Sequence, residues 1–332
     1  GENSFWRRLG VMSEWTANDW NPEDSGKKIL KHIKLADYIT SASDRSALGS
    51  LTNSINYNAN GLEITHLLSA AKQTLIIPEH EELLKNRKAY LDEKENKLFE
   101  QIPEDLKSDI SNDLSKTKEL FWWLWRCLPQ TTYQELGSVL SLMPAETRLP
   151  DASIWSHLSL TSAMAGALAG YDLTSEDIAN NWPAKKPLSH PYIVSFTFSP
   201  IQELIKASRK IRDFWAGSWI LHYLSASVSW KLAQQYGPDI FIYPSLYEQP
   251  LIDHWLLQTY PDFQTWIKQP KDKQLLTAGF PNVLVLVLPK DKVNGAMQLA
   301  KSKLLEEWNR ISDLVFEELK ARDWMPKLTQ DS

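Results

Sequence analysis

Residues 198–224 read F-S-P-I-Q-E-L-I-K-A-S-R-K-I-R-D-F-W-A-G-S-W-I-L-H-Y-L. They follow residues 192–198, a β-branched and aromatic run with alternating side chains, which predicts a strand. Ser199-Pro200 is typical of a helix start, and the spacing then predicts one long helix over 201–236 with a bend near Gly217. The fold of the C-terminal part is therefore decided by a strand that leads directly into a long helix.

The pattern continues downstream of that helix. We expect, in chain order, a short strand, a Pro-rich aromatic insertion with some helix, a buried strand and a long amphipathic helix, at residues 239–243, 245–281, 283–288 and 293–324. The order strand, helix, strand, strand, helix is that of a ferredoxin-like fold whose final strand is short or missing. Many nucleotidyl-transferase palms share this plan, but so common a fold does not determine function.

The N-terminal part has a different pattern. Residues 1–180 are expected to be all-helical, with helical spacing over 27–48, 79–99, 114–128, 132–142 and 153–169. Thr131 or Thr132 resembles an N-cap with Glu135 as capping-box partner, and Ser153 resembles a second cap. The sequence thus predicts an α+β protein with a helical domain at 1–180 and a ferredoxin-like domain with a helical insertion at 190–325.

Composition excludes several classes of protein. The net charge of −5 excludes a globally basic nucleic-acid binder, so any such contact needs a local basic patch. The single Cys127 excludes internal disulfides and cysteine zinc fingers, and it favours a cytoplasmic location. No apolar run approaches the ~20 residues of a membrane helix, so we expect no membrane contact. Because the chain does not begin with Met, we expect an excerpt of a longer subunit.

A basic cluster stands out within the opening stretch, at Lys206, Arg209, Lys210 and Arg212. On a continuous helix most of this cluster shares one side with Asp213, where it would suit phosphate groups. The alternative is a solvated helix face that pairs with its own acidic neighbours. Trp215, Trp219 and Leu221, which follow, are expected to be core residues.

Signatures of an isolated enzyme are absent from the sequence. It contains no His-x-x-x-His pair, no His-Asp doublet, no Gly-Gly pair, no Walker-type loop and no serine nucleophile elbow. A lone Glu-x-x-His at Glu63 and His66 is half of what a di-metal site needs. Asp37 and His157 lie on predicted helices, where each is either a structural polar residue or a metal ligand.

Three motifs in combination resemble one family, the large subunit of type III-B CRISPR effector complexes. They are A-E-T-R-L-P-D-A-S-I-W-S-H-L-S-L-T-S-A-M-A-G-A-L at 145–168, P-I-Q-E-L-I-K-A-S-R-K-I-R-D-F-W-A-G-S-W-I-L at 200–221 and Y-G-P-D-I-F-I-Y-P-S-L-Y-E-Q-P at 236–250. A weaker match is L-A-D-Y-I-T-S-A-S-D-R at 35–45. The resemblance implies an HD-type domain at 1–180, incomplete because its His-Asp doublet is absent, and a first palm domain at 190–325.

The resemblance also implies a role and candidate sites. Full-length relatives cleave single-stranded DNA and make cyclic oligoadenylates from ATP with divalent metal (Mg or Mn). Asp37 and His157 fall at metal-ligand positions, and Ser208, Arg209, Lys210 and Arg212 become candidates for nucleotide or RNA contact. The implied partners are other CRISPR effector subunits, guide RNA, target RNA and single-stranded DNA. No catalytic residue is assigned, since the Gly-Gly-Asp-Asp motif of the second palm is also absent.

Two alternatives remain open from the residues. One is a free HD-type metal-dependent phosphohydrolase that would act on single-stranded DNA. The other is a helical interaction protein with no RNA role. The family resemblance favours a subunit that scaffolds the 5′ end of the guide RNA and senses target RNA. Such a chain is expected to bind or scaffold rather than catalyse.

Overall fold

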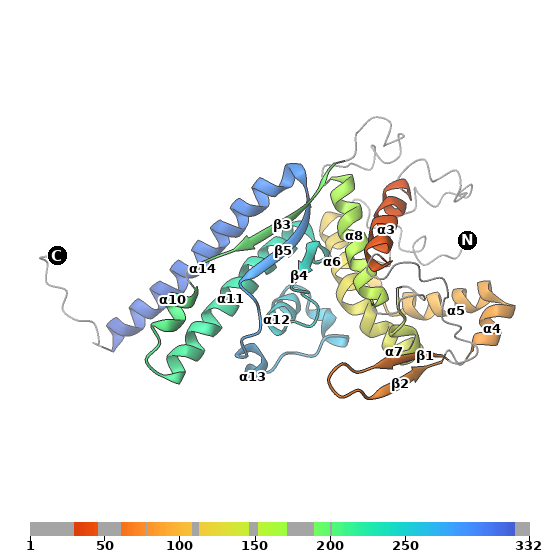
Figure 1. Ribbon diagram of the computed structural model, residues 1–332, viewed down its shortest axis with the longest axis horizontal. Coiled ribbons are helices and arrows are strands. Elements are labelled where there is room, and N and C mark those ends of the chain that lie inside the picture. The colour runs from red at the N-terminus through yellow and green to blue at the C-terminus, as the bar shows by residue number, and fades with distance from the viewer. Residues whose placement is uncertain are drawn as a thin grey trace, which may run out of the picture. The chain divides into compact units, whose positions relative to one another are not determined.

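A computed structural model describes residues 30–45, 61–76, 79–107, 113–145, 152–170, 189–199 and 201–322 (Figure 1). The chain divides into two compact units. Unit 1 comprises residues 1–192, 253–269 and 287–290, and unit 2 comprises 193–252, 270–286 and 291–332. Part of the insertion between the second and third strands of the predicted palm therefore belongs to unit 1.

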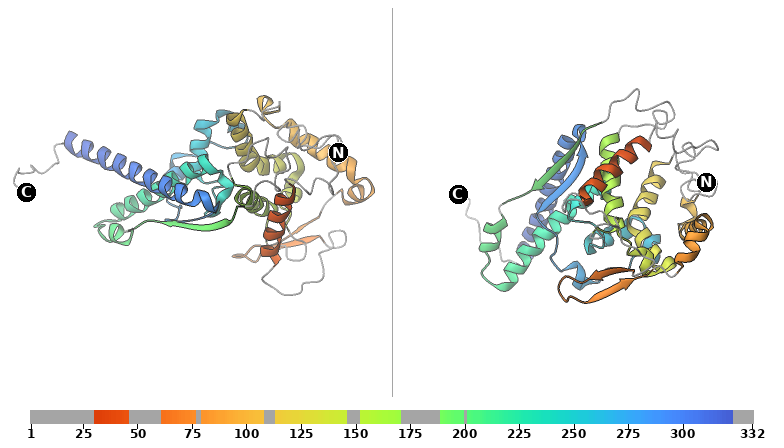
Figure 2. Two further views of the ribbon diagram at one scale, coloured as in Figure 1. Left: turned by 90° about the horizontal axis from the view of Figure 1, so that it is seen from above. Right: turned by 45° about the vertical axis from the view of Figure 1, so that its right-hand side comes forward.

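Unit 1 is mostly helical. Its described helices are α3 (Leu30–Arg45), α4 (His80–Lys85), α5 (Arg87–Glu100), η1 (Glu104–Leu106), α6 (Leu114–Trp122), the π-helical turn η2 (Trp123–Cys127), α7 (Leu128–Ser141) and α8 (Ile154–Ala169). Helix α3 packs against α8, and they lie side by side in Figures 1 and 2. The predicted cap of α8 is confirmed, because the Ser153 hydroxyl accepts a hydrogen bond from the Ser156 N–H at 3.2 Å.

A two-stranded sheet corrects the all-helical prediction for this part of the chain. Strands β1 (Leu62–Thr65) and β2 (Lys72–Leu75) pair antiparallel, with Leu62 opposite Leu75. Gly61, at φ 69°, precedes the hairpin, and a Cβ there would lie 2.6 Å from the Leu75 carbonyl oxygen. Glu63 of the Glu-x-x-His pair lies on β1 and forms an ion pair with Lys72 at 2.8 Å. That motif is therefore not on a helix.

The expected cap at Thr131 or Thr132 is also wrong. Both threonines lie inside α7 and their hydroxyls donate to the carbonyls of Cys127 and Leu128, four residues back. The helix begins earlier because the π-helical turn joins α6 to α7 without a break. Trp123 in this turn is fully buried and meets the Trp266 ring edge-on at 5.5 Å. The tryptophan cluster thus belongs to the core of unit 1.

The sheet of unit 2 has the order β3-β5-β4. Its strands are β3 (Pro191–Thr197), β4 (Phe241–Tyr243) and β5 (Val283–Pro289), each close to its predicted position. Strands β4 and β5 pair antiparallel, with Phe241 opposite Leu286. Leu284 and Leu286 are fully buried, whereas Ile193 on β3 is 75% exposed. This alternation leaves one face of β3 open to solvent.

Two long helices accompany this sheet. Helices α11 (Ile211–Tyr236) and α14 (Val293–Ala321) pack against each other along their length (Figure 1). Gly237, at φ 100°, caps α11 as predicted. The remaining elements are α10 (Ile201–Lys206), η3 (Pro238–Ile240), α12 (Pro250–Thr259), η4 (Pro261–Thr265), α13 (Asp272–Leu275) and η5 (Lys290–Lys292). None of the described helices is long and apolar enough to cross a membrane.

The mixed α+β composition predicted from the sequence is confirmed, and so is the order strand, helix, strand, strand, helix from β3 to α14. The predicted bend near Gly217 is wrong. The helical run instead breaks over residues 207–210, between α10 and α11, and α11 continues unbroken past Gly217. This break determines how the basic cluster is presented.

Candidate nucleic-acid interface

The four basic residues predicted to share a helix face lie on a helix–turn–helix corner instead. Lys206 ends α10, Arg209 and Lys210 lie in the connection, and Arg212 lies in the first turn of α11. We call residues 206–212 the basic turn. The prediction of one continuous helix fails because the Asp213 carboxylate accepts hydrogen bonds from the backbone N–H groups of Arg209 and Lys210, each at 3.2 Å.

This cap leaves the cations of the basic turn facing solvent. The side chains of Lys206, Arg209, Lys210 and Arg212 are all exposed, and Ser208 is half-buried. Asp213, which the sequence suggested as a possible ionic partner, bonds the backbone at the start of α11. A local positive potential therefore arises on a chain whose net charge is −5.

Aromatic and aliphatic side chains are exposed directly beside the basic turn. Ile211 is 88% exposed, Phe214 52% and Trp215 48%. The prediction that Trp215 is a core residue is therefore wrong. One turn further along α11, Trp219 is half-buried and its indole N–H donates to the Leu275 carbonyl at 3.0 Å. Exposed aromatic rings next to cations are typical of surfaces that bind single-stranded nucleic acid.

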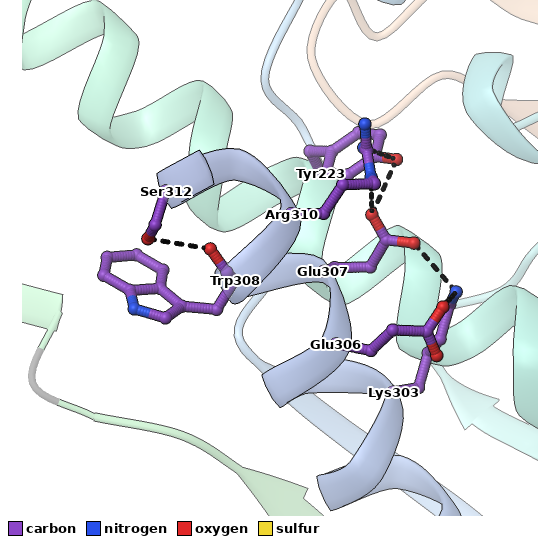
Figure 3. Close-up of polar contacts among 7 residues, drawn as sticks. All are labelled: Tyr223, Lys303, Glu306, Glu307, Trp308, Arg310 and Ser312. Atoms are coloured by element: carbon purple, nitrogen blue, oxygen red, sulfur yellow. Dashed lines mark hydrogen bonds and ion pairs between the residues drawn. The ribbon is translucent and has the colours of Figure 1, made fainter. Parts of the chain in front are cut away.

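Behind this surface, a polar network joins α11 to α14 (Figure 3). The Tyr223 hydroxyl donates to Glu307 Oε2 at 3.1 Å and accepts from Arg310 Nη2 at 2.7 Å. Arg310 Nε donates to the same Glu307 oxygen at 2.8 Å, and Lys303 contacts Glu307 Oε1 at 2.8 Å. We call these four residues the α11–α14 network. The Tyr223 ring also stacks on Trp219, with centroids 5.3 Å apart.

The electrostatics of the network favour its charged form. Burial pushes the pKa of Glu307 upward, but hydrogen bonds from Lys303 and Arg310 outweigh burial and hold that pKa below its usual value. Burial likewise opposes the charge of Lys303, yet its bonds to Glu306 and Glu307 raise the Lys303 pKa. The buried Glu307 carboxylate is thus satisfied by three donors, and the network fixes α11 against α14.

A second pair of predicted residues comes together in unit 1. Nε2 of His157 on α8 lies 3.0 Å from Oδ1 of Asp37 on α3. His157 is buried, whereas the Asp37 side chain is about half exposed. Within the described residues no group of three or more His, Cys, Asp or Glu side chains could hold a metal ion. A catalytic metal site ordinarily has three protein ligands, so this pair alone does not fit a divalent ion and we derive no chemical step through one.

Sequence reasoning did not find two of these interactions. Arg126, in the π-helical turn, makes a bidentate pair with Asp253 on α12, with both N···O distances 2.7 Å and both residues buried. The α11–α14 network was missed as well. The available signal was a charged residue inside an otherwise apolar stripe, as at Arg126 and Glu307. That signal marks a buried ion but does not identify its partner.

Comparison with known proteins identifies the class of protein. Residues 193–313, which contain the basic turn and the α11–α14 network, match the family described as CRISPR-associated protein Cmr2, N-terminal. The fold of the chain is similar to a subunit in a type III-B Cmr-beta complex bound to cognate target RNA, with a TM-score of 0.54 over 99% of this chain at 17% identity. The chain therefore has the fold of a type III-B CRISPR subunit.

Curated relatives specify which subunit. The chain is 27% identical over 146 residues to the CRISPR system Cmr subunit Cmr2 of Pyrococcus furiosus, and 28% identical over 115 residues to that of Saccharolobus solfataricus. These matches cover 44% and 35% of this chain. The resemblance predicted from the sequence is confirmed: the chain is Cmr2-like and corresponds to part of a type III-B large subunit.

The chain is short relative to these proteins. It covers 35% of the solved Cmr-beta chain. Its matched stretches cover 13% and 10% of the two curated Cmr2 proteins. The activities and partners of whole Cmr2 proteins are therefore not carried over to this chain directly.

Proposed function

We propose that this chain works inside a type III-B RNA-guided effector complex, where it scaffolds the 5′ end of the guide RNA and senses the pairing of guide and target RNA. The single observation that carries the proposal is the position of the basic turn. It lies within the stretch that matches the Cmr2 N-terminal family, and it exposes four cations. Guide and target RNA and other effector subunits are the partners this role requires.

We further propose the domain assignment predicted from the sequence, an HD-type domain over 1–180 and a ferredoxin-like first palm over 190–325. The strand order β3-β5-β4 with the packed helices α11 and α14 supports the palm, because it is a ferredoxin-like order that lacks one edge strand. The 3.0 Å contact between Asp37 and His157 supports the HD-type assignment, since both residues fall at positions implied by the family resemblance.

In this proposal, Ser208, Arg209, Lys210 and Arg212 bind phosphate groups of RNA or of a nucleotide. Arginine and lysine side chains neutralise phosphates, so removing one of these cations weakens binding and flattens its salt dependence. The basic turn would then form one wall of a nucleotide pocket in a full-length subunit, whose opposite wall comes from a second palm. Cleavage of single-stranded DNA and synthesis of cyclic oligoadenylates from ATP would belong to that full-length subunit.

The experiment compares two double variants of the 332-residue chain in binding to labelled single-stranded RNA over a range of salt concentrations. Arg209→Ala with Lys210→Ala is expected to weaken binding and to lower the slope of log K against log salt by roughly 1.4, about 0.7 for each neutralised single-strand phosphate. The control, Lys231→Ala with Lys301→Ala, removes two exposed cations from α11 and α14 and is expected to leave the slope unchanged. Equal slopes for wild type and both variants would overturn the phosphate assignment.

A free metal-dependent phosphohydrolase is the second candidate function, and the Asp37–His157 pair is the observation that favours it. It requires manganese- or nickel-dependent cleavage of single-stranded DNA by the chain alone, abolished by Asp37→Ala. The effector-subunit proposal expects no such cleavage, because the pair lacks further ligands within the described residues. Metal-dependent cleavage that Asp37→Ala abolishes would therefore favour the enzyme.

A further inference from the structure

Trp215 occupies an unusual position on α11. It is one helical turn before Trp219 and two turns before Tyr223, so the three rings follow one another along a single face of the helix. Exposure rises toward the start of the helix, because Tyr223 and Trp219 are half-buried and Trp215 is 48% exposed. A core residue would not end such a series in solvent.

The rings behind Trp215 are held in fixed positions. Trp219 stacks on Tyr223 at an interplanar angle of 23°, and its indole N–H is bonded to the Leu275 carbonyl. Tyr223 is bonded in turn to Glu307 and Arg310, as Figure 3 shows. The guanidinium of Arg310 also lies over the Tyr223 ring, 5.5 Å from its centroid. Trp215 is therefore mounted on a rigid part of the molecule, which lowers the entropic cost of stacking a ligand on it.

Charge adjoins the exposed ring. Arg212 and Trp215 are three residues apart on a helix, so their side chains are neighbours on its surface. Arg209 and Lys210 lie immediately before the same turn, and all three cations are exposed. A flat aromatic surface beside three cations complements a ligand that carries a planar ring and a phosphate. An apolar protein surface would have to desolvate these charges.

We propose that Trp215 stacks a nucleobase whose phosphate binds the basic turn, so that this surface takes a nucleotide unit and not phosphate alone. The inference rests on the proposed function, because it uses the same basic turn and adds the group that recognises the base. A nucleotide unit has two sources, a single-stranded RNA and free ATP. Stacking on an aromatic side chain tolerates any base, so the surface is expected to bind without sequence preference.

The test measures binding of three probes to the 332-residue chain: a single-stranded RNA, a strand of equal length with abasic sites, and ATP with tripolyphosphate as its base-free counterpart. Trp215→Leu is expected to weaken RNA binding at least about fivefold and to leave the abasic strand unaffected, because the variant can no longer stack a base. Trp215→Tyr keeps a ring and is expected to retain binding. The matched control is Trp308→Leu on α14, where the ring is 42% exposed and lies apart from the basic turn in sequence.

The outcomes separate the two claims. If Trp215→Leu weakens binding of RNA alone, the site belongs to a strand, and if it weakens binding of ATP but not of tripolyphosphate, the site belongs to a free nucleotide. Unchanged binding of every probe by Trp215→Leu, with weaker binding by Arg209→Ala and Lys210→Ala, overturns the stacking inference and leaves the proposed function standing. If the two charge substitutions change nothing either, both fail together.

Discussion

The carboxylate of Asp37 lies 3.0 Å from Nε2 of His157, although 120 positions separate the two residues in the sequence. The contact joins α3 to α8, the two helices that pack against each other in unit 1. The family resemblance pointed to each residue separately, and the fold brings them together. The pair ties two helices together, and this structural role can be measured apart from any metal.

A double-mutant cycle on this pair tests that role. Asp37→Ala and His157→Ala are each expected to destabilise unit 1, and the coupling energy is expected to be about 1 kcal/mol, as for a hydrogen bond between partly buried groups. Urea unfolding of the four proteins at pH 7 gives the value. Strictly additive effects of the two substitutions would show that the contact contributes nothing to stability.

The buried Arg126–Asp253 pair predicts a larger and asymmetric effect. Arg126→Met leaves the Asp253 carboxylate buried without its partner, which is expected to cost about 3–5 kcal/mol. Arg126→Met combined with Asp253→Leu replaces both charges by apolar groups and is expected to recover most of that stability. Chemical denaturation of the single and double variants measures both steps. A double variant no more stable than the single one would contradict this explanation.

Glu306 and Glu307 form a matched pair for testing the α11–α14 network. Both bond Lys303, but the Glu306 side chain is 64% exposed and that of Glu307 only 9%. Glu307→Gln is expected to lower the free energy of unfolding by about 1–3 kcal/mol at pH 7, because three donors lose a charged acceptor. Glu306→Gln is expected to change it by less than about 1 kcal/mol. Similar decreases in the two variants would mean that burial of the carboxylate is not what matters.

The depressed pKa of Glu307 also sets the direction of a pH effect. Its contribution to stability is fully present above about pH 4.5, the value for an unfolded glutamate, and is lost as pH falls through the lower folded pKa. Wild-type stability should therefore decline more steeply below pH 4.5 than that of Glu307→Gln. Unfolding titrations from about pH 6 to about pH 3 measure the difference.

His222 predicts a second pH window, between about 4 and 6.5. Burial lowers the pKa of this imidazole to about 4, and its Nδ1 accepts the Phe280 N–H at 2.8 Å, so the folded state holds it neutral. As pH falls from 6.5 to 4 the unfolded state binds a proton that the folded state refuses, and on the order of 3 kcal/mol of stability is lost. His222→Gln keeps a hydrogen-bond acceptor but cannot titrate. Its unfolding free energy should be flat across this window, and a slope equal to that of wild type would contradict the assignment.

Local patterns in the sequence predicted those elements whose signals are complete within a few residues. The apolar run of β5, the alternation of β3 and the Ser153 cap of α8 each need no distant partner to be recognised. The family motifs extended this to Asp37 and His157, which the fold then brings together.

The failures have a shared physical cause, since each feature depends on a specific side-chain interaction. The break before α11 follows from Asp213 binding two backbone N–H groups, in a segment whose residues otherwise favour a helix. The β1–β2 hairpin exposes nearly all its side chains, so it has little hydrophobic periodicity to detect. Arg126 finds Asp253 across 127 positions, and no spacing rule predicts that.

The central claim is that this chain serves an RNA-guided complex, and one measurement tests it most directly. The tagged chain is purified from its native host under mild conditions, the co-purifying RNA is sequenced, and the accompanying proteins are identified by mass spectrometry. The account predicts guide RNA with one defined 5′ end together with other effector subunits. Recovery of the chain with neither RNA nor partner subunits would contradict it.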